Sequence, residues 1–227
     1  MAYLVIIPTP IGNLGDMSQR AIDALSSCDI ILCEDTRVCS RLLSQYNIKK
    51  QMITYRDDNE LKQCDAVINI IQSGKTVGLT SDAGTPAISD PGYRIVHACR
   101  KNNIPIMSIP GPCAAITILA ASGLPTDKFL FGGFLPNKSH GRQKFFSEHK
   151  TLPYSIILYE SCHRIQKFLE DACLILGDQR IICVAKEVTK FHESFFVGNL
   201  GEALSMIKQQ SQKGEYTIVI APEKYEF

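Results

Sequence analysis

The chain has 227 residues, which suits one large domain or two of roughly 110 residues. Hydrophobic residues make up 45% of it, enough for a substantial core, and a net charge of +1 gives no global indication of a nucleic-acid partner. No apolar run reaches the ~18 residues of a membrane span. The start, MAYLVIIPTPIGN, lacks a basic flank, so we expect a first strand rather than a signal peptide, in a cytoplasmic protein with no membrane contact.

Short β-rich runs alternate with helical patterns in the first half of the chain. Ser18 and Thr36 are candidates for helix N-caps, and Gly74 is a candidate helix stop. This alternation predicts a mostly parallel sheet with helices on both faces. The predicted strands are residues 3–9, 29–34, 51–55, 76–81 and 104–110.

The second half has a different order of elements. A helical pattern at residues 113–123 is followed by five predicted strands, with further helices before the third and the fifth. The connection between the third and fourth strands is too short for a crossover, which predicts a hairpin and a mixed sheet. The strands are residues 128–134, 154–160, 180–188, 193–200 and 215–222. We therefore expect an N-terminal α/β domain of residues 1–112 and a C-terminal α/β domain of residues 113–227.

Nine cysteines are scattered singly through the chain, most of them inside apolar runs, and no CxxC occurs. This pattern is typical of buried, reduced thiols. Five scattered histidines with no ligand spacing argue against a structural metal, so we predict none.

Three turn-rich loops follow predicted strands of the first domain: residues 8–16, 81–92 and 110–115. Each has Gly or Pro where the backbone must turn tightly and could approach a ligand. Taken singly, each is explained by a plain turn, and none matches a Walker A or GxGxxG motif. Because parallel strands place their carboxyl ends at one sheet edge, the three together predict a binding cleft.

Two charged segments allow both a structural and a functional interpretation. In CEDTR, Asp35 caps the next helix while Arg37 pairs with Glu34, or all three face the cleft. In residues 136–150, Lys138, Arg142 and Lys144 contact phosphates, or they lie on a solvated helix.

Several motifs occur in order along the chain: PTPIGNLGDMSQRA, CEDTRVCSRLL, SDAGTPAISDPGYRIV, PGPCAA, SGLPTDKFLFGGFLP, YESCHRI, AKEVTKFHE and GEYTIVI. Together they resemble the ribosomal RNA small subunit methyltransferase I family, part of the tetrapyrrole methylase superfamily. The resemblance covers nearly all of residues 3–221. The combination of EDTR, SDAGTPxISDPG and SGLPTDxFLFxGFLP is highly specific.

This resemblance implies two α/β domains with S-adenosylmethionine in the cleft between them, and a homodimer. It implies 2′-O-methylation of a cytidine in the decoding centre of 16S rRNA, in the small ribosomal subunit. The cofactor positions that it implies are Pro10, Ser81, Asp82, Thr85, Cys113, Ala114, Glu160 and Val188. It also divides the loop after the fourth strand: SDAGT faces the ligand, while Asp90 in SDPG is a turn or cap residue.

The chemistry sets requirements on the acceptor side. The acceptor oxygen must lie in line behind the methyl carbon, and a base or a cation should help to remove the proton of the ribose hydroxyl. Candidates for the base are Glu34, Asp35 and Asp82, and Arg37 could lower the hydroxyl pKa or hold a phosphate. Asp82 could instead bind the amino group of the cofactor. A nucleotide inside an RNA fold must leave its stack to react.

The chain departs from the family pattern at three places. YRDDNE stands where the family has HEHNE, Cys162 replaces a proline, and longer members continue into a C-terminal helical segment beyond the position of Phe227. The first departure leaves open which substrate the acceptor side of the cleft binds, and the last leaves open how strongly the chain binds RNA. Two alternatives therefore remain: a small-molecule methylase of the tetrapyrrole type, and a ribosome-associated protein that binds the cofactor without transferring methyl.

Overall fold

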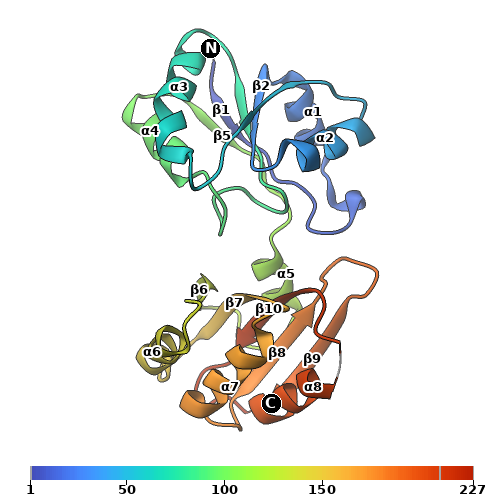
Figure 1. Cartoon of the computed structure of the whole chain (residues 1–227), viewed down its shortest axis with the longest axis vertical. Helices are drawn as coiled ribbons and strands as arrows, with labels where there is room; N and C mark the ends of the chain where they lie inside the picture. Colours follow the sequence, from blue (N-terminus) through green and yellow to red (C-terminus); the bar gives the residue numbers. More distant parts are fainter. Residues whose placement is uncertain (1, 210, 227) are drawn as a thin grey trace. The chain divides into compact units, whose positions relative to one another are not determined.

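The computed structural model describes residues 2–209 and 211–226 (Figure 1). The chain forms two compact units, which divide between Cys113 and Ala114. No helix in the described ranges is long and apolar enough to cross a membrane. The nine cysteines form no disulfide, and six of them are buried.

The first unit contains a five-stranded sheet in the order β3-β2-β4-β1-β5, and every neighbouring pair is parallel. All five predicted strands are confirmed, and so is the parallel sheet. The elements are β1 (Leu4–Ile6), η1 (Leu14–Asp16), α1 (Gln19–Ser27), β2 (Ile30–Cys33), α2 (Thr36–Gln45), β3 (Gln51–Thr54), α3 (Glu60–Gln72), β4 (Val77–Leu79), α4 (Tyr93–Lys101) and β5 (Ile106–Ser108).

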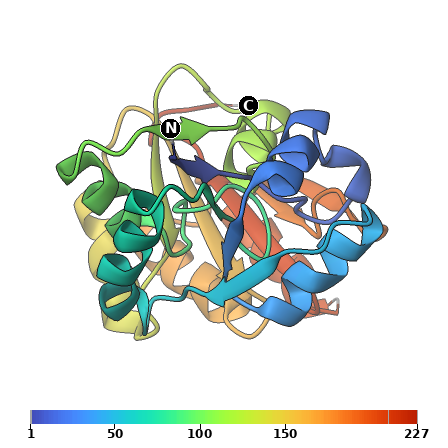
Figure 2. The ribbon, with the colours of Figure 1, turned by 90° about the horizontal axis from the view of Figure 1, so that it is seen from above.

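Helices cover both faces of this sheet, because successive side chains of a strand point to opposite faces. Leu4 and Ile6 of β1 pack in one core with residues of α3 and α4. Val5 and Ile7 pack in a second core with residues of α1 and α2. Figure 2 shows the two helix pairs on opposite sides of the central strands of this unit.

The second unit contains a mixed sheet in the order β6-β7-β10-β8-β9, in which only β6 and β7 are parallel. The predicted hairpin is confirmed, with β8 and β9 in register from Ile181↔Asn199 to Lys186↔Ser194. One core joins the sheet to three helices, α6, α7 and α8. The elements are α5 (Ala114–Ala121), β6 (Phe129–Phe134), α6 (Ser139–His149), β7 (Ser155–Ser161), α7 (Ile165–Leu176), β8 (Ile181–Lys186), β9 (Ser194–Asn199), α8 (Leu200–Gln209) and β10 (Glu215–Ile220).

The helix ends follow local capping chemistry, with one correction. Ser18 caps α1 as predicted, and Gly74, at φ +99°, follows the end of α3. The N-cap of α2 is Asp35, as the structural interpretation of CEDTR predicts, and not Thr36, because the Asp35 carboxylate accepts a hydrogen bond from the Arg37 backbone N–H while Thr36 is already helical.

The start of α4 is capped from a distance. Gly92 precedes the helix at φ +142° and has no side chain that could cap it. The buried Glu60 carboxylate takes this role, because its Oε1 accepts from the backbone N–H groups of Gly92 and Arg94, both at 3.0 Å. The YRDDNE segment therefore holds the end of the 81–92 loop.

Candidate functional site

Three loops meet at the carboxyl edge of the parallel sheet, as the sequence predicts. The loop after β1 pairs with the loop after β4, where Thr9 N donates to Gly84 O at 2.9 Å and Gly84 N donates to Thr9 O at 3.1 Å. The loop after β5 joins them, since Thr85 Oγ1 donates to Pro112 O at 2.9 Å. A Cβ at Gly84 would come within 3.2 Å of Ile11, so this crossing favours glycine.

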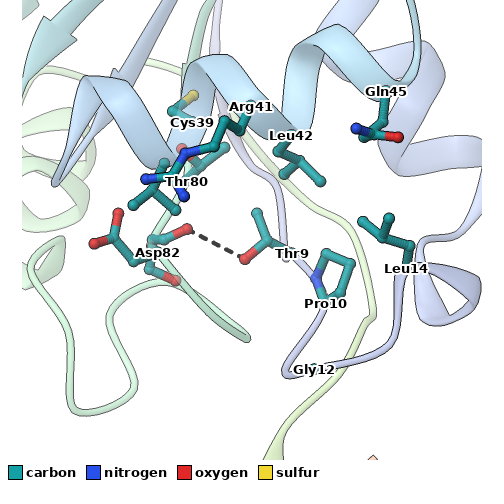
Figure 3. A pocket seen from close by; sticks show the side chains of 12 residues that line it. Thr9, Pro10, Gly12, Leu14, Cys39, Arg41, Leu42, Gln45, Thr80 and Asp82 are labelled. Atoms are coloured by element: carbon teal, nitrogen blue, oxygen red, sulfur yellow. Dashed lines mark hydrogen bonds between the residues drawn. The ribbon is translucent and has the colours of Figure 1, made fainter. Parts of the chain in front are cut away.

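A pocket of about 290 Å³ opens at this edge (Figure 3). The loops after β1 and β4 form one wall, and the α2 helix forms the other. The lining residues are Thr9, Pro10, Gly12, Leu14, Val38, Cys39, Arg41, Leu42, Gln45, Thr80, Ser81 and Asp82. Of the positions implied by the family pattern, Pro10, Ser81 and Asp82 lie in this wall, while Thr85 and Cys113 lie in the adjoining loops.

The hydroxyl groups in the pocket wall are already committed to the protein. Thr9 Oγ1 donates to Ser81 O at 3.2 Å, the dashed contact in Figure 3, and Thr80 Oγ1 donates to Leu32 O at 3.1 Å. Ser81 Oγ donates to the carbonyls of Ala83 and Gly84. These contacts use the hydroxyl protons and hold the backbone of the wall in place, so the hydroxyl oxygens remain available to a ligand as acceptors.

Glu34 and Asp82 hold the ends of β2 and β4 together. Asp82 N donates to Glu34 Oε1, and Asp35 N donates to Asp82 Oδ1, each at 3.2 Å. Burial raises the pKa of Glu34, and the negative charges of Asp82 and Asp57 add to that rise, while the backbone hydrogen bond from Asp82 opposes it.

Asp35 pairs with the side chain of Arg37, whereas Glu34 accepts a backbone hydrogen bond from Asp82. Asp35 Oδ2 lies 2.6 Å from Arg37 Nη2, and these hydrogen bonds hold the pKa of Asp35 well below its usual range. The interpretation in which Arg37 pairs with Glu34 is therefore wrong, because the extended backbone at the N-cap turns the Asp35 carboxylate toward Arg37.

Asp90 is a residue whose surroundings the sequence did not reveal. It is half-buried, and burial together with the negative charge of Glu34 raises its pKa to about 7, while a hydrogen bond with Ser81 lowers it. It does not cap α4, because Glu60 does so. Asp90 is visible in the sequence as the second aspartate of SDAGTPAISDPG, but its burial, which raises its pKa, depends on how the loop folds.

In the second unit, Glu160 and Val188 lie at the ends of β7 and β8. Glu160 is 1% exposed, and its Oε1 accepts from Ser161 N and from Arg164 Nε, each at 2.7 Å. Its Oε2 is buried without a hydrogen-bond partner among the described residues. Val188 is buried between Glu187 at φ +53° and Thr189 at φ +65°, a backbone conformation uncommon for these residue types.

The basic segment 136–150 forms α6 and divides into buried and exposed cations. Arg142 is 3% exposed and lies 2.6 Å from Asp171 of α7, so its guanidinium faces the interior and not a phosphate. Lys138 and Lys144 are exposed, and Lys144 lies 3.8 Å from Glu148. Burial of Arg142 argues against the predicted RNA contact at that position and leaves the two lysines.

The family model for tetrapyrrole (corrin/porphyrin) methylases matches residues 3–204. The chain belongs to the tetrapyrrole methylase family. Within it, the chain is 42% identical to the Ribosomal RNA small subunit methyltransferase I of Escherichia coli O157:H7, over 97% of this chain and 78% of that protein. It is 39% identical to the protein of the same name from Thermotoga maritima, over 97% of this chain and 99% of that one. The crystal structure of diphthine synthase covers the whole chain and has a TM-score of 0.78 at 12% identity, which shows a shared fold.

As a member of the tetrapyrrole methylase family, the chain is a methyltransferase with S-adenosylmethionine as its methyl donor. The residues present fit that cofactor. In the first unit, Asp82 presents a carboxylate at the pocket wall. In the second unit, Glu160 Oε2 has no hydrogen-bond partner among the described residues and is a buried acceptor that a hydroxyl or amino group would satisfy. No group of histidine, cysteine, aspartate and glutamate within the described ranges could hold a metal ion.

Proposed function

We propose that this chain transfers a methyl group from S-adenosylmethionine to the 2′-oxygen of a cytidine ribose in the decoding centre of 16S rRNA. The observation that carries the proposal is the 42% identity to a ribosomal RNA small subunit methyltransferase I over 97% of the chain. The similarity to diphthine synthase has 12% identity and supports the fold alone. Because ribosomal RNA is its substrate, we place the enzyme in the cytoplasm, and we propose a homodimer.

The cofactor supplies an activated methyl group, so the chain's own residues mainly position the reactants. We assign Pro10, Ser81, Asp82, Thr85, Cys113, Ala114, Glu160 and Val188 to cofactor binding. The loops after β1, β4 and β5 are hydrogen-bonded to one another at the edge of the sheet, which supports the assignments from Pro10 to Cys113. The buried Oε2 atom of Glu160 supports the assignment of Glu160, on β7.

Proton removal from the ribose hydroxyl falls to Glu34 in this proposal. A base is more effective when its pKa is raised toward the working pH, and burial raises that of Glu34. Asp35 is the weaker candidate, because its hydrogen bonds with Arg37 stabilise the charged carboxylate. Arg37 itself is exposed beyond this pair and is placed to hold a phosphate. Lys138 and Lys144 provide further cationic contacts for RNA.

A methyl-transfer assay tests the function. Purified protein is incubated with labelled S-adenosylmethionine and, separately, with unmethylated small ribosomal subunits, deproteinised 16S rRNA and a tetrapyrrole. We expect label in ribosomal RNA, mapped as one ribose-methylated cytidine. Label on the tetrapyrrole alone would establish the small-molecule alternative. Cofactor binding by calorimetry with no label in any acceptor would establish the non-catalytic alternative.

A further inference from the structure

The pocket beside the three loops has a second wall that no proposed cofactor position explains. Val38, Arg41, Leu42 and Gln45 project from α2 into it, facing the wall formed by Pro10 and the residues after β4. In Figure 3, Arg41 and Leu42 extend from the helix toward the loops. A methyl acceptor must lie next to the donor, so this wall is in the right place to receive it.

Arg41 is the cation of this wall, and its terminal nitrogens have no partner among residues 2–209 and 211–226. Its Nε donates to the Arg37 carbonyl at 3.3 Å, while neither Nη takes part in an ion pair or hydrogen bond within the described part of the chain. The nearest cation along the helix, Arg37, differs in that its Nε and Nη2 donate to Asp35. An uncommitted guanidinium at a pocket is a binding group for a phosphate, since its paired N–H groups match two phosphate oxygens.

The remaining surface of the pocket suits a flat ring. Leu14 and Leu42, with Pro10 and Val38, give apolar contacts, and Gln45 offers an amide that can both donate and accept. The volume of about 290 Å³ is just below the ~300–1,000 Å³ of common ligand pockets and has room for one nucleotide. Enzymes that modify a nucleotide inside RNA hold it flipped out, against apolar side chains.

We propose that the α2 wall, together with Leu14 at the end of the loop after β1, is the subsite for the flipped-out target nucleotide, with Arg41 on its phosphate, Leu14 and Leu42 against its base, and Gln45 at the base edge. The assignment rests on the proposed function for the identity of the substrate. It makes Arg41 a substrate-binding residue and leaves the cofactor to the opposite wall.

Binding of cytidine 5′-monophosphate and of cytidine, measured by titration with S-adenosylhomocysteine present, tests the phosphate contact. We expect Arg41→Ala to weaken the monophosphate about tenfold and to leave cytidine unchanged, because only the phosphate meets the guanidinium. Arg41→Lys should recover part of the loss, since it keeps the charge without the paired geometry. Arg20→Ala, an exposed arginine of α1 away from the pocket lining, is the matched control and should bind as wild type does.

The affinity for S-adenosylmethionine and the transfer kinetics complete the test. We expect unchanged cofactor affinity in Arg41→Ala, with a raised KM for small ribosomal subunits. A loss of cofactor affinity equal to the loss for the monophosphate would overturn the proposal, because Arg41 would then hold the cofactor carboxylate. Equal monophosphate affinity in wild type and Arg41→Ala, or none in either, would overturn it as well.

The same measurements separate this proposal from the proposed function. Wild-type protein that methylates small ribosomal subunits with no effect of Arg41→Ala would reject the subsite and keep the function. Wild-type protein that methylates no RNA, but binds the monophosphate in an Arg41-dependent way, would reject the function and support a nucleotide subsite. A melting curve for each variant confirms that it is folded.

Discussion

Arg142 supports the fold of the second unit, and its replacement should be far more costly than that of its neighbour Lys144. Asp171 accepts hydrogen bonds from Ser139 Oγ at 2.5 Å, from Gln143 Nε2 at 2.7 Å and from Arg142 Nε at 2.8 Å. Only 3% of the Arg142 side chain and 9% of the Asp171 side chain are exposed. Removing the arginine leaves a buried carboxylate without its cation.

The expected cost follows from this burial. Breaking a buried ion pair by deleting one partner costs about 3–5 kcal/mol, so Arg142→Ala should lower the unfolding free energy of the second unit by that amount. At about 4–8 °C per kcal/mol for a domain of this size, the melting temperature should fall by more than about 10 °C. Lys144→Ala should cost about 1 kcal/mol or less, since its partner Glu148 is 3.8 Å away and both side chains are more than half exposed.

Urea unfolding followed by circular dichroism measures the difference, with one transition fitted for each unit if two are seen. The penalty should also shrink in acid. The pKa of Asp171 is lowered overall. Burial raises it, but the hydrogen bonds from Ser139, Gln143 and Arg142 lower it by more. The pair therefore stabilises the protein above the unfolded aspartate pKa and loses that effect as the pH falls. Equal stability of Arg142→Ala and Lys144→Ala, with a reduced salt dependence of RNA binding in Arg142→Ala, would refute this reasoning and restore Arg142 as a phosphate contact.

Three further substitutions probe the sheet edge. Asp82→Ala should weaken S-adenosylmethionine binding about tenfold, because it removes a charged acceptor from the pocket wall, and calorimetry that shows unchanged affinity would contradict its placement. Arg37→Ala should leave cofactor affinity unchanged and lower methyl transfer about tenfold, since it removes the exposed cation that we propose holds an RNA phosphate; equal turnover would reject that role. Asp90→Asn should mainly change stability. The pKa of Asp90 in the folded state, about 7, exceeds its value in the unfolded chain, so the wild type loses stability as the pH rises toward 7. The variant should therefore be as stable as the wild type near about pH 4 and more stable above about pH 8. A melting-temperature difference that stays constant with pH would contradict the raised pKa.

The strands, the parallel first sheet and the hairpin of the second could be predicted because their signals are local. The apolar run Leu4–Ile7 alternates between two cores, and a strand covered by helices on both faces has this continuous pattern. The hairpin between β8 and β9 followed from the short connection alone. Even the error at Thr36 is small, since Asp35 and Thr36 are both good capping residues and only the backbone angles decide between them.

The burial and the partners of individual charged side chains could not be predicted in the same way, because the partners lie far along the chain. Arg142 lies in a basic run, and its partner Asp171 is 29 residues away. Glu60 belongs to a segment that departs from the family pattern, and its contacts are the backbone N–H groups at the start of α4, 32 and 34 residues away. Sequence distance hides these pairs, so the local charges revealed neither the buried ion pair of Arg142 nor the cap that Glu60 provides for α4.

Whether an arginine is paired with a buried carboxylate therefore distinguishes structural cations from functional ones better than the local density of charge does. Arg142 and Arg164 each lie within 2.7 Å of a carboxylate that is less than a tenth exposed, so moving either to a ligand would leave a buried charge behind. Arg41 has no such commitment and can bind a phosphate at little structural cost. A net charge of +1 is therefore no argument against the proposed RNA substrate, because a few cations without buried partners can contact phosphates whatever the sum of charges over the chain.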